Sequence, residues 1–144
     1  MWTKVTSYQG RILVVDQEDW CRQFLSQVIK LMGIAEFQLA ASVEEALEAL
    51  EESAFDLLIT DLHLPEHARL LENCRQRFPA MRFILMTPHR SQVYHWSYVE
   101  QVEVVIKPLS LDEIARKIRA AMLQKHRSKV EEDFRRLRQE AFRI

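Results

Sequence analysis

The sequence contains few of the residues that build the most recognisable binding sites. Its 144 residues include only two glycines and two cysteines. Phosphate loops and dinucleotide-binding fingerprints need closely spaced glycines, and Gly10 and Gly33 are far apart, which excludes both motifs. Cys21 and Cys74 belong to no metal-ligand spacing, so they predict neither a zinc site nor a disulfide framework. We expect both cysteines to be small core residues.

The sequence also lacks long apolar runs and a strong net charge. No apolar run approaches the roughly 18 residues of a membrane-spanning helix, and the first ten residues lack the apolar stretch of a signal peptide. The formal net charge is -1, which gives no overall reason to expect binding to nucleic acid or to an anionic membrane. We therefore expect a cytoplasmic protein with no membrane partner and no direct nucleic-acid contact.

The composition is that of one ordinary folded domain. Hydrophobic residues make up 48% and charged residues 28% of the chain, enough apolar material for a core. The charge is distributed unevenly, because residues 1–123 carry 13 basic and 17 acidic side chains, whereas residues 124–144 carry 7 basic and 4 acidic. This shift predicts a boundary, with a domain at 1–123 and a separate segment at 124–144.

Five short segments have the pattern of strands. A continuous apolar run ends in an acid at 11–16, mostly apolar runs lie at 55–60, 82–87 and 102–106, and a weaker alternating run lies at 35–40. Short apolar runs of this kind are typical of strands that are buried on both faces of a parallel sheet.

Helical periodicity separates these segments. Apolar residues recur at helical spacing after Asp19, Ser42 and Ser110, and shorter helices are expected at 67–77 and within 88–98. Ser42 with Glu45, and Ser110 with Glu113, form capping boxes that mark helix starts. Alternating strands and helices predict an α/β fold, a doubly wound five-stranded parallel sheet with five helices.

Polar residues stand where four of the five predicted strands end. Asp16, Gln17 and Glu18 follow the first strand, and the ends of the third, fourth and fifth strands carry Asp61, Thr87 and Lys107. Ligands of open α/β sheets bind at the carboxyl ends of the strands, so we expect these groups to converge. Carboxylates can hold a divalent cation of the magnesium kind, and one of them can act as a nucleophile toward a phosphoryl group.

The sequence resembles the receiver domains of two-component response regulators. The resemblance rests on ILVVD at 12–16, DLLITDLHLP at 56–65, LMT at 85–87 and IKP at 106–108, and covers about residues 10–123. It implies a flavodoxin-like (CheY-like) fold and phosphoryl transfer to Asp61 from a histidine kinase or a phosphotransfer protein. It also implies that Asp16, Asp61 and Gln17 hold Mg2+, that Lys107 pairs with the phosphoryl group, and that Thr87 moves toward it.

Two positions of the site depart from the family pattern, and a third argues against an enzyme. Gln17 stands where the family has a second acid, so magnesium should bind more weakly unless Glu18 substitutes for it. Val104 stands where the family has a switch aromatic, a role that Tyr94, Trp96 or Tyr98 could take over. A haloacid-type phosphatase would need an acid two residues after Asp61, where His63 stands, so we expect a signalling module and not an enzyme.

Two functions stay open on these residues. The first is a phosphorylation-dependent receiver that relays a signal to an output domain or partner, in transcription regulation. The second is a pseudo-receiver, a phosphorylation-independent interaction module, which the losses at Gln17 and Val104 would permit.

The terminal segment has a periodicity of its own. A stripe spaced alternately by four and three residues runs along 123–144, at Leu123, Arg127, Val130, Phe134, Leu137, Ala141 and Ile144. This heptad pattern predicts a linker or dimerisation helix, and hence a homodimer, with a terminal helix lying on the domain as the alternative. FRRLRQE at 134–140 also resembles the linker helices that join receivers to further domains, as in sigma-54-dependent activators.

Overall fold

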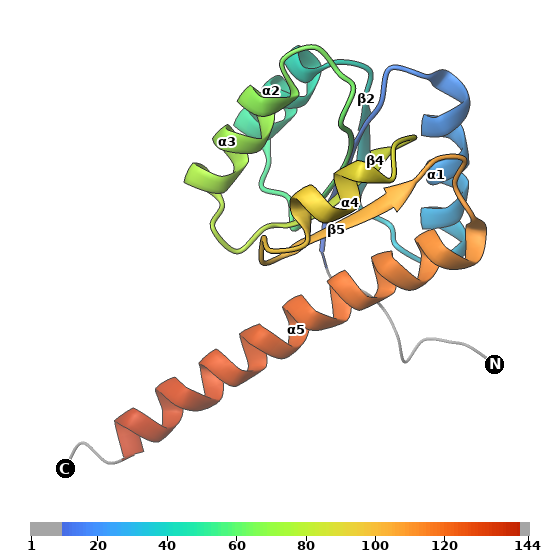
Figure 1. Cartoon of the computed structure of the whole chain (residues 1–144). Helices are drawn as coiled ribbons and strands as arrows, with labels where there is room; N and C mark the ends of the chain where they lie inside the picture. The colour runs from blue at the N-terminus through green and yellow to red at the C-terminus, as the bar shows by residue number, and fades with distance from the viewer. Residues whose placement is uncertain (1–9, 142–144) are drawn as a thin grey trace.

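The computed structural model describes residues 10–141, without the side chains of residues 124–132. Strands and helices alternate from β1 to α5, as predicted (Figure 1). The elements in order are β1 (Ile12–Val15), α1 (Asp19–Leu31), β2 (Phe37–Ala40), α2 (Val43–Glu52), β3 (Leu57–Asp61), α3 (His67–Arg77), β4 (Arg82–Thr87), α4 (Ser91–Trp96), β5 (Val102–Ile106) and α5 (Leu111–Ala141).

The five strands form one parallel sheet in the order β2-β1-β3-β4-β5. The chain adds strands on one side of β1 and then on the other, so the strand order reverses between β1 and β3. In doubly wound sheets this reversal opens a crevice at the carboxyl ends of the two strands, where ligands bind. The doubly wound fold class predicted from the sequence is confirmed.

Helices cover both faces of the sheet. The helices α2 and α3 lie against one face, while α1 and the first half of α5 lie against the other (Figure 1). Alternate residues of a central strand enter opposite clusters: Leu13 and Val15 pack toward α2 and α3, and Ile12 and Val14 toward α1 and α5. This two-sided burial is the reason why the central strands have continuous apolar runs.

The predicted helix boundaries agree with the local hydrogen bonds. At the start of α2 the Ser42 hydroxyl accepts from the Glu45 amide at 3.1 Å, and the Glu45 carboxylate accepts from the Ala41 amide at 2.7 Å. These reciprocal bonds satisfy backbone donors that a helix start leaves free. Gly33 follows α1 with φ of 79°, a left-handed conformation that stops the helix at little steric cost.

The long helix α5 has two unlike halves. Ile114, Ile118 and Met122 in its first half are buried in the core beneath the sheet. Its second half leaves the body of the domain and extends into solvent (Figure 1). Leu123, Phe134 and Leu137 of the predicted stripe are 49%, 67% and 63% exposed, whereas its side chains at 127, 130 and 144 lie outside the described residues. A terminal helix lying on the domain is therefore contradicted over Phe134 and Leu137.

The burial of the two cysteines tests a further expectation. Both cysteines are free and buried, as predicted, one on each side of the sheet. Among the described residues, no helix is both long enough and apolar enough to cross a membrane.

Candidate functional site

The fold brings the predicted acids together at the switch point. Asp16 directly follows β1 and Asp61 is the last residue of β3, two strands that are neighbours in the sheet. Asp16 is fully buried and Asp61 is 7% exposed. Burying carboxylates is costly unless they are paired or bind a cation, so their position at this edge indicates a site for positive charge.

Lys107 supplies that positive charge from the end of β5. Its ammonium lies 2.8 Å from Asp16 Oδ2, 3.2 Å from Glu18 Oε1 and 3.4 Å from Asp61 Oδ2. Burial alone would lower the pKa of Lys107, but the hydrogen bond and charge of Asp16, together with the charge of Asp61, raise it above its ordinary value. Lys107 is therefore held as a cation among three carboxylates.

Glu18 is the third carboxylate of this group. Carboxylate oxygens of Asp16, Glu18 and Asp61 all lie within 4.8 Å of one another. Hydrogen bonds from the Trp20 indole at 2.7 Å and from Lys107 lower the pKa of Glu18 below its usual value. The Lys107 ammonium also lies over the Trp20 ring, with its Nζ 5.9 Å from the ring centroid.

Gln17 occupies a different environment from its neighbour. Gln17 is exposed, and its backbone carbonyl accepts a hydrogen bond from the Arg22 guanidinium at 3.0 Å. The structure thus brings Glu18 into the acid cluster, the substitute that the sequence offered as an alternative. The signal was present in the sequence, as an acid two residues after Asp16, but spacing alone could not show which side chain turns inward.

Thr87 is buried at the end of β4 and lies beside two histidines. Its hydroxyl accepts from the His89 amide at 3.1 Å and lies 3.3 Å from His63 Nε2. The backbone amide of His63 also donates to Asp61 Oδ1 at 2.9 Å, and the rings of His63 and His89 are 5.1 Å apart. His63 therefore connects the Asp61 loop to Thr87.

The aromatic residues near β5 differ in their packing. Val104 is half-buried on β5, and Trp96 of α4 packs against the same core cluster. Tyr94 and Tyr98 are 78% and 92% exposed. Of the three aromatics that could replace a ring at Val104, Trp96 is thus the one that contacts the core.

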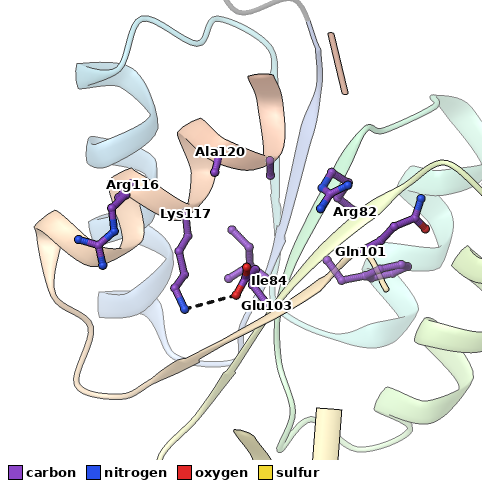
Figure 2. Close-up of a pocket in the computed structure, with 9 residues that line it drawn as sticks. Arg82, Ile84, Gln101, Glu103, Arg116, Lys117 and Ala120 are labelled. Atoms are coloured by element: carbon purple, nitrogen blue, oxygen red, sulfur yellow. Dashed lines mark ion pairs between the residues drawn. The ribbon is translucent and has the colours of Figure 1, made fainter. Parts of the chain in front are cut away.

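A separate cavity lies toward the other end of the sheet. Its volume is about 280 Å³, and it is lined by Arg82 at the start of β4, by Gln101 just before β5 and by Lys117 of α5. Figure 2 shows Lys117 reaching toward Glu103, to which it is paired at 3.6 Å. Lys117 also donates a hydrogen bond to the Val104 carbonyl at 3.1 Å, so its ammonium already has two partners. None of the residues that line this cavity belongs to the acid cluster.

The fold and the site define a doubly wound α/β domain with a lysine-bridged acid cluster at its switch point. The family model of the response regulator receiver domain matches residues 12–119. The chain therefore belongs to the response regulator receiver domain family. Receiver domains are signalling modules that interact with histidine kinases or phosphotransfer proteins, and they bind Mg2+ at an acidic cluster.

Individual relatives agree with this assignment. The chain is 35% identical to the response regulator protein FleR of Pseudomonas aeruginosa over 82 residues, which are 56% of this chain but only 17% of FleR. A CheY-like receiver domain from Methanospirillum hungatei has a TM-score of 0.71 at 24% identity, covering 82% of this chain and 97% of that one. NtrX from Brucella abortus, solved with ATP, has a TM-score of 0.76 at 20% identity, covering 87% of this chain and 29% of NtrX. The two structures show the likeness of fold, and this chain corresponds to a small part of FleR and of NtrX.

Proposed function

We propose that this chain accepts a phosphoryl group on Asp61 from the phosphohistidine of a histidine kinase or a phosphotransfer protein. In this step an Asp61 carboxylate oxygen attacks phosphorus, the phosphorus–nitrogen bond breaks, and the imidazole leaves and takes up a proton. The observation that supports the proposal is the position of Asp61, which lies at the switch point with the Lys107 ammonium 3.4 Å from its Oδ2. A cation at that place stabilises negative charge on the transferred group.

Thr87 and His63 give the site a way to respond. A phosphoryl group adds about -1.5 to -2 charge at neutral pH and three acceptor oxygens. The Thr87 hydroxyl is a neutral hydrogen-bonding group at the end of β4, and it lies 3.3 Å from His63 Nε2. We propose that Thr87 turns from His63 to a phosphoryl oxygen, while Lys107 pairs with the same group.

Magnesium binding follows from the chemistry of the cluster. Mg2+ prefers oxygen ligands, and three carboxylates that lie within 4.8 Å of one another supply them. We propose that Asp16, Asp61 and Glu18 hold the ion, with Glu18 in the place of Gln17, the third ligand that the family resemblance implies. When bound, the ion neutralises charge on the transferred phosphoryl group.

We also propose where the signal goes. Residues 1–123 would form the receiver, and residues 124–144 a helical extension that links it to an output in transcription regulation and pairs with a second copy. The compartment that we propose is the cytoplasm. A second function, a phosphorylation-independent pseudo-receiver, is favoured by two observations, the exposed Gln17 at the second acid position and Val104 in place of a ring.

Labelling with a small phosphodonor tests the proposed function. We expect the chain to become labelled by radioactive acetyl phosphate in the presence of Mg2+, and Asp61→Asn to abolish labelling because it removes the nucleophilic oxygen. Asp112→Asn, which changes an exposed carboxylate at the start of α5, is the matched control and should label normally. Absence of label in the folded wild-type chain would favour the pseudo-receiver, and label retained in Asp61→Asn would contradict the site.

A further inference from the structure

We infer that two copies of this chain pair in parallel through the second half of α5, with Phe134 and Leu137 at the seam. The inference deepens the pairing proposed above and rests on it, and it adds the orientation and the contacts. The second half of α5 is an exposed helix. Residues 123–141 continue α5 for about 28 Å at the usual helical rise, and in this stretch Phe134 and Leu137 are 67% and 63% exposed.

Such a helix needs a covering surface to be stable. Isolated helices of this length are marginal in water, and most of their stability in proteins comes from packing of an apolar face. Figure 1 shows no other element of the described chain beside this half of α5. The body of the same copy therefore does not cover Phe134 and Leu137.

The spacing of the exposed residues fits a second helix of the same kind. Leu123, Phe134, Leu137 and Ala141 fall on alternating three- and four-residue steps of one heptad repeat. In a coiled coil these are the a and d positions, at which each side chain inserts between four residues of the facing helix. Identical copies present the same seam, so a second copy fits this face at the layers of Phe134, Leu137 and Ala141.

The charges beside the seam decide the orientation. Asp133 and Glu140 fall at g positions and Arg138 at an e position, and all three are exposed. In a parallel pair the g residue of one helix faces the e residue of the next heptad on the other, which places Asp133 opposite Arg138. In an antiparallel pair g faces g, so two acids would oppose each other. Charge complementarity therefore favours the parallel arrangement.

Parallel pairing fixes where the rest of each copy lies. Both receiver bodies then lie at the same end of the paired helices. A change in the body of one copy is then transmitted directly to the partner, because α5 is continuous from the sheet to the seam.

Single-cysteine variants of the full chain test the orientation. In a parallel pair in register, Leu137→Cys and Ala141→Cys should each form a disulfide-linked dimer alone under mild oxidation. The exposed Arg136→Cys, at a c position, is the control and should give little cross-link. Buried Cys21 and Cys74 leave the wild-type chain without background. In an antiparallel pair, at most one of these two variants would form a disulfide-linked dimer on its own. The main cross-linked dimer would then form in a mixture, between Leu137→Cys on one copy and Ala141→Cys on the other.

Sedimentation of charge variants gives an independent check. Asp133→Arg and Arg138→Asp should each weaken association at least several-fold, and the double exchange should restore it. Phe134→Glu should weaken association at least tenfold, whereas Gln139→Glu, which makes the same charge change at the outer f position, should leave it unchanged. A wild-type chain that remains a monomer up to millimolar concentration would overturn the pairing and the inference together. Dimers that cross-link only in the mixture would overturn the orientation alone, and neither result would change labelling of Asp61.

Discussion

The two halves of α5 have similar apolar periodicity but opposite surroundings. In the first half Ile114 and Ile118 are fully buried against the sheet, and in the second half Phe134 and Leu137 are mostly exposed. A helical stripe of apolar residues therefore predicts a face that needs covering, but not what covers it. The first half is covered within the chain, and for the second half we propose another copy.

Charged residues show the same contrast. Lys107 in the body is 10% exposed and lies against three carboxylates, whereas the ion pair between Arg136 and Asp133 in the extension is 3.9 Å long, with side chains 65% and 54% exposed. Exposed pairs of the second kind typically stabilise by about 0–1 kcal/mol, because water screens them. Charge in the body defines a site, and for charge in the extension we propose a role in orienting a second copy.

The largest difference that we predict between the two regions is in thiol reactivity. Burial raises the pKa of both Cys21 and Cys74 to about 12, with Asp16 adding to the effect at Cys21. At pH 8 their thiolate fraction is then roughly a thousandfold smaller than that of an ordinary cysteine. A cysteine introduced by Leu137→Cys should react with iodoacetamide at an ordinary rate, while the native thiols stay unmodified.

The pH dependence of this reaction has a definite sign. A raised thiol pKa keeps the proton on, so alkylation of Cys21 and Cys74 should rise steadily as pH increases from 8 toward 12. The stability linked to these thiols is fully present below their ordinary pKa of 9.0 and falls as pH rises above it. Mass spectrometry of alkylated peptides measures both sites, and rapid modification of either at pH 8 would contradict their burial.

The fold could be predicted from the sequence because local and long-range signals agreed. Buried strands such as 55–60, and capping residues such as Ser42, each pointed to the element that the structure contains. Where strand alternation was weak, at 35–40, the observed strand is shorter, Phe37–Ala40, and it lies at the edge of the sheet with one neighbour.

The second prediction compares core packing in the two halves of α5. Ile118→Ala should lower the free energy of unfolding by about 3 kcal/mol, because it removes a fully buried side chain and leaves a cavity. Leu137→Ala should change it by less than about 0.5 kcal/mol when measured at a concentration at which sedimentation shows a monomer. Urea denaturation of both variants at low micromolar concentration measures the difference. Equal losses would mean that the second half of α5 packs against its own domain.

The site was predictable in its strand ends and less so in its loops. Asp16, Asp61, Thr87 and Lys107 could be placed because the carboxyl ends of parallel strands meet at one edge. Gln17 and Glu18 follow a strand in a loop, where each residue's direction depends on local hydrogen bonds. The amide of Glu18 donates to Asp16 Oδ1 at 2.8 Å, and its side chain accepts from Trp20, and such contacts do not follow a sequence period.

The smallest effect that we predict distinguishes these two neighbours. Glu18→Gln should weaken magnesium binding by about tenfold, because it replaces a charged oxygen ligand with a neutral one of the same size. Gln17→Ala is the matched control and should change the affinity by less than about twofold, because Gln17 lies outside the acid cluster. Titration with magnesium chloride, followed by calorimetry and by tryptophan fluorescence, measures both.

The fluorescence signal can itself be assigned to the site. Trp20 donates to Glu18 at 2.7 Å and lies 5.9 Å from the Lys107 ammonium, so an ion that draws Glu18 inward changes the surroundings of the indole. Trp20→Phe should therefore remove most of the fluorescence response while calorimetry still detects binding. If Gln17→Ala weakened binding as much as Glu18→Gln, the loop would have to turn on metal binding so that Gln17 enters the cluster. Gln17→Asp would then tighten binding, whereas with Glu18 already in place it should add little.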